Sequence, residues 1–168
     1  LKYIAGIFDP LGLISWVTIR FRILFQNICK DKIEWDENIN EEQKNKFIEL
    51  VNRFQSIEEL KIPRCVTSEN CLSTELHIFS DASIEEYGAC VYAVSRTNTE
   101  VHRNLIYSKA KVVPIKKITI PKLELIACIL AANMYLNIMK DKNLWENAKV
   151  IFWTDSMAAL HWIKGDKQ

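Results

Sequence analysis

The chain has 168 residues, of which 49% are hydrophobic and 26% are charged, and its formal net charge at pH 7 is +1. This length allows one domain with an appendage or two small domains, and the hydrophobic fraction is sufficient for a folded core. The balanced charge excludes a protein that binds nucleic acid through a global basic excess, so any such contact must come from local clusters.

The cysteine content and the hydrophobic runs indicate the cellular compartment of the protein. The cysteines are odd in number, scattered and without a C-x-x-C pair, which argues against a disulfide framework and against a structural zinc site. They are Cys29, Cys65, Cys71, Cys90 and Cys128. No apolar run reaches membrane-spanning length and no signal peptide opens the chain, so we expect an intracellular, cytoplasmic protein with no membrane partner.

Residues 1–65 are predicted to be helical. After a turn at Pro10 and Gly12, apolar residues recur at helical spacing from residue 17 to residue 28. Asn40 and Gln43 form a capping-box pattern at the start of a second helix, which we expect to end near Pro63. The aromatic residues of this segment are expected to form a core between the helices rather than a stacking surface. They are Trp16, Phe21, Phe25, Phe47 and Phe54.

From residue 72 the pattern changes to strands. The runs "ELHIFSDA", "YGACVYAVS" and "NLIYSKAKV" predict three antiparallel strands. A long helix follows in residues 119–140, with Pro121 in its first turn. The run "AKVIFWTDS" is typical of a strand buried on both faces, with Trp153 in the core, and "MAALHWIK" begins another helix. The order predicts an α/β fold, a mixed sheet covered by helices.

Three carboxylates occupy unusual positions in this order. Asp81 ends the first strand, Asp155 ends the last, and Glu124 lies in the first turn of the helix between them. If the two strands are parallel neighbours, their ends lie roughly 5 Å apart, and a helix packed on the sheet can direct its first turn at both. Carboxylates that close favour hard divalent cations such as Mg²⁺ or Mn²⁺. Two such ions would support phosphodiester hydrolysis.

Each carboxylate also has a purely structural explanation. The helix dipole favours Glu124 in a first turn of any helix. Asp155 with Ser156 could cap the next helix, and the segment from Asp81 to Ser83 could form a turn. The spacing by itself leaves both interpretations open.

Several ordered motifs together resemble a known family. "FSDAS" with "YGACVY", then "TIPKLELIA", then "WTDS" with "LHWI" resemble the ribonuclease H domain of BEL/Pao-type retrotransposon polyproteins. Upstream, "YIAGIFDPLGLISWVTIRFRILFQ", "IEWDE" and "KIPR" are similar to the segment that joins reverse transcriptase to that domain, although the family usually has Pro in place of Trp16. The resemblance implies a helical connection segment over residues 1–65 and a ribonuclease H-like domain over residues 72–168.

The resemblance also implies a shortened domain. The family's sheet has five strands, of which this chain would hold four, and a further helix carries a fourth acidic or histidine ligand. The chain begins at Leu1 and stops after "HWIKGDKQ", and Asp166 lies too early to replace that ligand. We therefore expect a piece of a longer polypeptide, truncated at the C-terminal end of the fold.

The same resemblance assigns roles. It implies that Asp81, Glu124 and Asp155 bind two Mg²⁺ or Mn²⁺ ions and are catalytic, and that the neighbouring Ser83 and Ser156 help to place substrate phosphate. The implied activity is hydrolysis of the RNA strand of RNA–DNA hybrids during reverse transcription. The implied partners are the hybrid and the reverse transcriptase domain of the same polyprotein.

A basic stretch precedes Glu124. It contains five lysines and no acidic residue: Lys109, Lys111, Lys116, Lys117 and Lys122. Lys109, Lys111 and Lys122 are candidate contacts to substrate phosphates, and a solvated face is the alternative.

Two rival functions remain. A catalytically inactive retroelement remnant would keep the fold as a structural or nucleic-acid-binding module. An integrase-like nuclease is less favoured, because "TIPKLEL" stands at the ribonuclease H helix position and no zinc-binding segment precedes it. The histidines lack metal-ligand spacing, and His77 is expected to be structural.

Overall fold

The computed structural model describes residues 6–34, 36–55, 57, 61–63, 65, 66, 71–140 and 145–165, and in this part of the chain helices come first, followed by three strands and then by a helix, a strand and a helix. The elements are α2 (Ser15–Lys30), α3 (Glu41–Gln55), β1 (Ser73–Ala82), β2 (Glu86–Arg96), β3 (Val101–Val112), α4 (Ile120–Ile138), β4 (Lys149–Trp153) and α6 (Met157–Lys164). Asp166, Trp35 of "IEWDE" and Arg64 of "KIPR" lie outside the described residues. Among the helices that are described, none has the length and apolarity needed to cross a bilayer.

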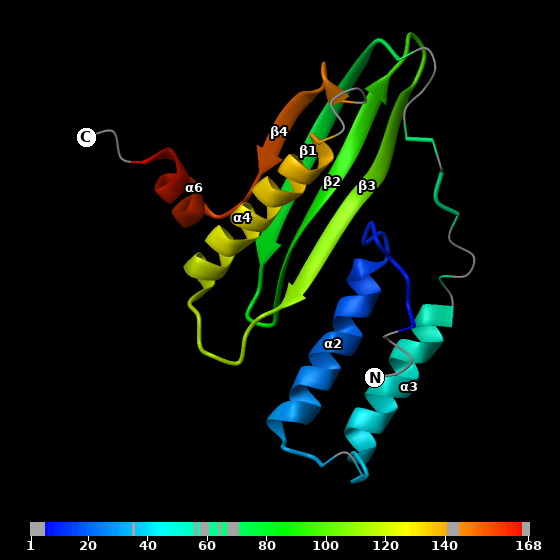
Figure 1. Ribbon diagram of the computed structural model, residues 1–168, viewed down its shortest axis with the longest axis vertical. Coiled ribbons are helices and arrows are strands. Elements are labelled where there is room, and N and C mark those ends of the chain that lie inside the picture. Colours follow the sequence, from blue (N-terminus) through cyan, green and yellow to red (C-terminus); the bar gives the residue numbers. More distant parts are fainter. Residues whose placement is uncertain are drawn as a thin grey trace.

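The strands form one mixed sheet in the order β3-β2-β1-β4. β1 and β2 are antiparallel, as are β2 and β3, whereas β4 pairs with β1 in parallel. A parallel pair needs a crossover connection, and α4 provides it across one face of the sheet (Figure 1). The predicted α/β fold with three antiparallel strands and one parallel strand is therefore confirmed.

The core lies between the sheet and α4. Strand residues alternate between the two faces, so β1 and β2 direct one set of side chains at the helix: Leu76, Ile78, Ala89, Val91 and Ala93. α4 contributes Leu130, Ala131 and Met134 at helical spacing. Burial of a large apolar side chain contributes roughly 1.5–3 kcal/mol, so this layer holds α4 against the sheet.

The segment before α2 is tied to the edge of the sheet at β3. Asp9 accepts hydrogen bonds from the backbone N–H groups of Leu13 (2.9 Å) and Ile14 (3.0 Å), which satisfies donors at the start of the helix. The Ser108 N–H donates to the Leu11 carbonyl (2.9 Å), and the Ser15 and Ser108 hydroxyls lie 2.6 Å apart. α2 is thereby docked on the sheet from its first residue.

α2 and α3 pack against each other through aromatic rings. Phe21, only 1% exposed, makes edge contacts with Phe47 and Phe54, so the expected core between the helices is confirmed for these residues. Trp16 was expected there too, but it is 61% exposed because it lies on a different side of α2 from Phe21. That prediction is wrong.

The ends of α3 differ in part from the prediction. The Asn40 side chain accepts from the Gln43 backbone N–H (2.8 Å), as a capping box requires. The Gln43 side chain does not reach back, because it donates to Asp31 instead (2.7 Å) and so ties the helix to the end of α2. The helix ends at Gln55, before the predicted boundary at Pro63.

β4 is not buried on both faces. It is the last strand in the sheet order, and its Phe152 and Trp153 side chains are 50% and 47% exposed. Phe152 makes an edge contact with Tyr135 of α4, while Trp153 lies on the opposite face beside His77 and Phe79. The expectation that Trp153 belongs to the core is wrong, because a continuous apolar run cannot reveal that its strand lies at the edge of the described sheet.

Candidate active site

Sheet register places two of the predicted carboxylates at the same level. The parallel pairing of β1 with β4 runs to Phe79 opposite Trp153, and Asp81 and Asp155 each follow two residues later. Adjacent strands lie about 4.8 Å apart, so the two side chains emerge next to each other. Glu124 comes from α4, where it is the fifth residue rather than part of the first turn.

The three carboxylates converge. Asp81, Glu124 and Asp155 each offer one oxygen, and these three atoms lie within 4.8 Å of one another. Asp81 and Asp155 are exposed, whereas Glu124 is 8% exposed. In the part of the chain that the structure describes, no basic side chain forms an ion pair with any of them.

The surroundings of Glu124 disfavour the charged form of its carboxyl group. Burial raises the pKa of its carboxyl group, and the nearby charges of Asp81 and Asp155 raise it further, while a hydrogen bond from the Ala82 backbone acts in the opposite direction. Its Oε2 is buried and has no hydrogen-bond partner among the residues that the structure describes. A buried acceptor without a donor is costly, so this oxygen is suited to a cation.

The donor set fits a hard divalent ion. Mg²⁺ takes oxygen ligands at about 2.0–2.1 Å, so two oxygens on opposite sides of one ion lie about 4.2 Å apart. Ligands shared between two ions about 4 Å apart can be spaced more widely. The observed spread of up to 4.8 Å is compatible with either arrangement. The unpartnered Glu124 oxygen and the absence of competing ion pairs in the described residues both favour binding of a cation.

We expect the substitution Glu124→Gln to stabilise the metal-free protein at neutral pH. A carboxyl group whose pKa is higher in the folded than in the unfolded protein stabilises the fold most at pH values below its unfolded pKa, which is near 4.5. This stabilisation is lost as the pH rises through the folded pKa. Gln keeps an acceptor for the Ala82 N–H and removes the charge. The melting temperature in EDTA should therefore rise relative to wild type at about pH 7.5 but not below about pH 4.5.

The matched control is Glu146→Gln, which removes the same charge from an exposed position. It should leave the melting temperature nearly unchanged at both pH values. Mg²⁺ should stabilise wild type and not Glu124→Gln, which reverses the order of the two proteins. A Glu124→Gln protein that is less stable than wild type in EDTA at neutral pH would contradict this account.

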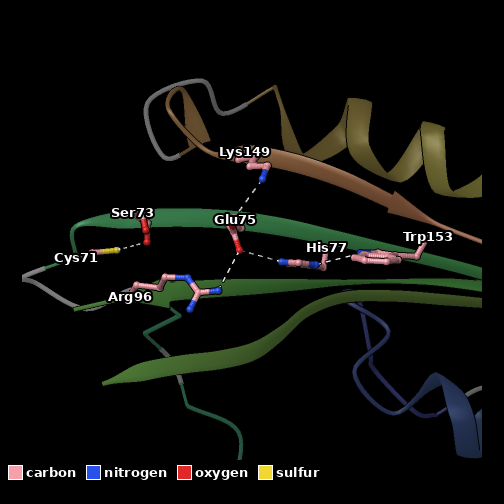
Figure 2. A network of polar contacts seen from close by, with 7 residues as sticks. All are labelled: Cys71, Ser73, Glu75, His77, Arg96, Lys149 and Trp153. Carbon is pink, nitrogen blue, oxygen red and sulfur yellow. Dashed lines mark hydrogen bonds and ion pairs between the residues drawn. The ribbon is translucent and has the colours of Figure 1, made fainter. Parts of the chain in front are cut away.

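A polar network holds β1 against its neighbours on the face away from α4 (Figure 2). The Trp153 Nε1–H of β4 donates to His77 Nδ1 (3.0 Å), and His77 Nε2 lies 3.3 Å from Glu75. Glu75 also contacts Arg96 of β2 (3.5 Å) and Lys149 of β4 (3.9 Å). The hydrogen bond from His77, followed by the charges of Arg96 and Lys149, lowers the pKa of the Glu75 carboxyl.

This network gives His77 a structural role. Because Nδ1 accepts from Trp153, the ring carries its proton on Nε2 and donates it to Glu75. Deeper between the layers, the Ser80 hydroxyl donates to the Trp153 carbonyl (3.4 Å). These contacts secure the β1–β4 register, which in turn sets the separation of Asp81 and Asp155.

Both candidate serines are engaged locally. The Ser83 hydroxyl accepts from the Glu85 and Glu86 N–H groups (3.2 and 3.1 Å) in the turn between β1 and β2. The Ser156 hydroxyl caps α6 by accepting from the Ala159 N–H (3.2 Å). Ser156 therefore has the structural role considered for this segment, and a role for either serine in binding substrate stays a prediction.

The candidate lysines are spread over two elements. Lys109 and Lys111 are exposed on β3, and Lys122 is exposed near the start of α4, two residues before Glu124. Lys109 lines a cleft that Asp81 also lines, whereas Lys111 lines a neighbouring hollow beside Arg22. Of the three lysines, Lys109 is thus the one that lines a cleft together with Asp81, a member of the carboxylate cluster.

The cleft also contains residues that sequence reasoning missed. Trp16 and Arg20 of α2 line it together with Phe79 of β1. Trp16 and Arg20 are four residues apart, and this spacing indicated that they lie on the same side of a helix. The sequence did not indicate that this side faces the end of β1.

Comparisons with known proteins bear on the whole chain. Residues 1–156 match the family model described as "Pao retrotransposon-like RNaseH-like domain", on both sides of the predicted boundary near residue 70. No curated protein matches. Among solved structures, the chain is similar to a chain of the foamy viral protease-reverse transcriptase in complex with dsDNA, with 13% identity and a TM-score of 0.45. The alignment covers 96% of this chain and 34% of that one.

Proposed function

The chain belongs to the family of Pao retrotransposon-like RNaseH-like domains, and from that premise we propose that it hydrolyses the RNA strand of RNA–DNA hybrids during reverse transcription. The observation that carries this proposal is the convergence of Asp81, Glu124 and Asp155 within 4.8 Å, without basic partners in the described residues. Acidic clusters of this kind are expensive to maintain unless cations bind them.

The chain's own residues have distinct tasks in this reaction. Asp81 and Asp155, which are exposed, would hold Mg²⁺ or Mn²⁺ where a nucleic acid can approach, and Glu124 would hold it from the buried side. Two such ions supply activation of water and stabilisation of the leaving oxygen. The backbone N–H of Ala82 donates to Asp81 Oδ1 (2.7 Å), which fixes the orientation of that carboxylate. Ser83, Ser156, Lys109, Lys111 and Lys122 remain candidate contacts to phosphate.

The proposal extends to partners and setting. Residues 1–65 would connect a reverse transcriptase domain of the same polyprotein to the ribonuclease H-like domain of residues 72–168. The hybrid would be recognised by its shape and 2′-hydroxyls rather than by base sequence. An intracellular, cytoplasmic location agrees with the five cysteines of the sequence, which are odd in number and contain no C-x-x-C pair.

The test is cleavage of a labelled RNA–DNA hybrid in Mg²⁺, in Mn²⁺ and in EDTA. We expect the RNA strand to be cut with either ion and to stay intact in EDTA, because without the ions no positive charge lowers the pKa of the attacking water or stabilises the leaving oxygen. DNA duplex of the same sequence is the control and should not be cut.

Three outcomes would contradict the proposal. Cleavage that survives EDTA would exclude metal catalysis. Equal cleavage of the DNA duplex would indicate a different nuclease. Hybrid binding without cleavage in either ion would favour the alternative, an inactive remnant that acts as a structural or nucleic-acid-binding module.

A further inference from the structure

A cleft lies between α2 and the carboxyl-terminal end of β1. Its volume is about 320 Å³, which is within the range of roughly 300–1,000 Å³ typical of small-ligand sites. Trp16, Ile19 and Arg20 of α2 line one side. Phe79 and Asp81 of β1 line the other, so the cleft reaches a member of the carboxylate cluster.

The contacts of α2 hold this cleft open at a set width. The hydroxyls of Ser15 and Ser108 are 2.6 Å apart, and Gln26 donates to the Val113 carbonyl (2.7 Å) near the other end of the helix. Trp16 and Arg20 are one helical turn apart, so both project from the same side of a helix that is fixed at two points.

The chemistry of the walls suits a nucleotide. Trp16 and Phe79 line the cleft and are 61% and 41% exposed, so aromatic surface is accessible there. Phe79 also contacts the rings of His77 and Trp153. Arg20 Nη2 lies 3.2 Å from Glu86 Oε1, which holds the guanidinium at the cleft. Lys109 adds a second positive charge, and the carboxylates of Asp81 and Glu86 line the cleft as well. Aromatic rings stack on bases, and basic side chains contact phosphates.

We propose that this cleft binds one nucleotide of the hybrid next to the scissile phosphate, with Trp16 stacking on its base and Arg20 contacting its phosphate. The inference rests on the proposed function, because Asp81 defines where the scissile phosphate lies. It makes α2 of the N-terminal segment part of the substrate-binding surface. Trp16 and Arg20 are therefore residues that position substrate and do not take part in the chemical step.

The first test is Trp16→Ala in the full chain, with steady-state kinetics on the hybrid. Loss of one stacking contact should raise KM roughly 5- to 100-fold and leave kcat nearly unchanged. Trp16→Phe should restore most of the affinity. Phe8→Ala removes an aromatic side chain that is 90% exposed and does not line the cleft, so it should match wild type.

A substrate series identifies the stacked base. A single abasic position is moved along the strand near the cleavage site, and KM is measured for wild type and Trp16→Ala. At one position the abasic substrate should raise KM for wild type and cause no further rise for Trp16→Ala. Additive effects at every position would overturn the stacking assignment.

Arg20 is tested by the salt dependence of hybrid binding in Ca²⁺. The double substitution Arg20→Gln with Glu86→Gln keeps the local charge balanced, and it should reduce the slope of log affinity against log salt by about 1. The control is Lys44→Gln, which removes a positive charge from α3. Because Lys44 forms its ion pair with Glu41, this substitution should leave the slope of log affinity against log salt unchanged. An unchanged slope in the double variant would overturn the phosphate contact.

The two levels of inference fail differently. If wild type cleaves the hybrid and Trp16→Ala retains the wild-type KM, the cleft assignment is wrong and the proposed function stands. If wild type neither cleaves nor binds the hybrid, the proposed function fails and the cleft assignment fails with it. Trp16→Ala should have the same melting temperature as wild type, because the Trp16 ring is largely exposed. A rise in KM then reflects lost substrate binding and not lost stability.

Discussion

Asp155→Asn should lower kcat/KM for hybrid cleavage by at least about 10³-fold, equivalent to about 4 kcal/mol of transition-state stabilisation. The substitution keeps the shape of the side chain and removes one of the three charges that converge within 4.8 Å. A cation bound by fewer carboxylates is held more weakly and neutralises less of the developing charge. The measurement is the initial rate of RNA-strand cleavage in Mg²⁺, over a range of ion concentrations.

The fold should not suffer from this change. Asp155 is exposed and has no ion pair within the described part of the chain, and the cap of α6 comes from Ser156 instead. Removing a charge near Glu124 also relieves part of the repulsion that raises the Glu124 pKa. The melting temperature in EDTA should therefore equal or exceed that of wild type, which separates loss of catalysis from loss of structure.

The control for Asp155→Asn is Asp36→Asn, which makes the same chemical change at an exposed position before α3. It should leave cleavage intact. Unaltered cleavage by Asp155→Asn, with correct folding, would remove this residue from the proposed metal site.

Gly12→Ala should reduce the free energy of unfolding by roughly 2–4 kcal/mol. Gly12 has a φ of +68°, and a Cβ built there would lie 1.8 Å from the Ser108 carbonyl oxygen. The neighbouring Leu11 carbonyl accepts from the Ser108 N–H (2.9 Å), so the backbone cannot retreat without losing that bond. Urea denaturation measures the loss, and hydrogen exchange should be faster in α2 than in α4 relative to wild type.

The chain provides a matched control at Gly165. This residue has a similar φ of +66°, but no atom of the described residues lies within 4 Å of a Cβ built there. Gly165→Ala should cost only the strain of its backbone conformation (φ +66°, ψ 142°), roughly 1–3 kcal/mol. Equal losses in the two variants would mean that the close approach to Ser108 contributes nothing, which would contradict the docking of the N-terminal segment described above.

The order of elements was predictable because its signals are local. Alternating patterns identified three strands, and a helical stripe after Pro121 identified α4. A parallel pairing of β1 with β4 followed from the crossover helix between them. The positions of Asp81 and Asp155 at the ends of those strands could then be predicted from sequence.

Errors arose where a neighbour far along the chain decides the outcome. Trp153 is exposed because β4 lies last in the described sheet order, and a run of apolar residues is the same at an edge and in the centre. Gln43 contacts Asp31 rather than its own helix terminus, since the turn between α2 and α3 brings a competing acceptor close. Trp16 is 61% exposed and lines the cleft, because it lies on a different side of α2 from Phe21, which contacts α3.

The sequence by itself determined which residues could form a metal site, because local patterns of polar and apolar residues indicate where strands end and where helices begin. Only the tertiary structure decided that carboxylate oxygens of Asp81, Glu124 and Asp155 lie within 4.8 Å of one another. It also decided that Glu124 is buried and that one of its oxygens has no hydrogen-bond partner within the described part of the chain. Tertiary packing likewise placed Trp16 and Arg20 beside Asp81. Distances, burial and pKa values depend on how separate segments pack against one another. This packing depends on contacts between residues that are far apart in the chain, so local sequence patterns do not specify it.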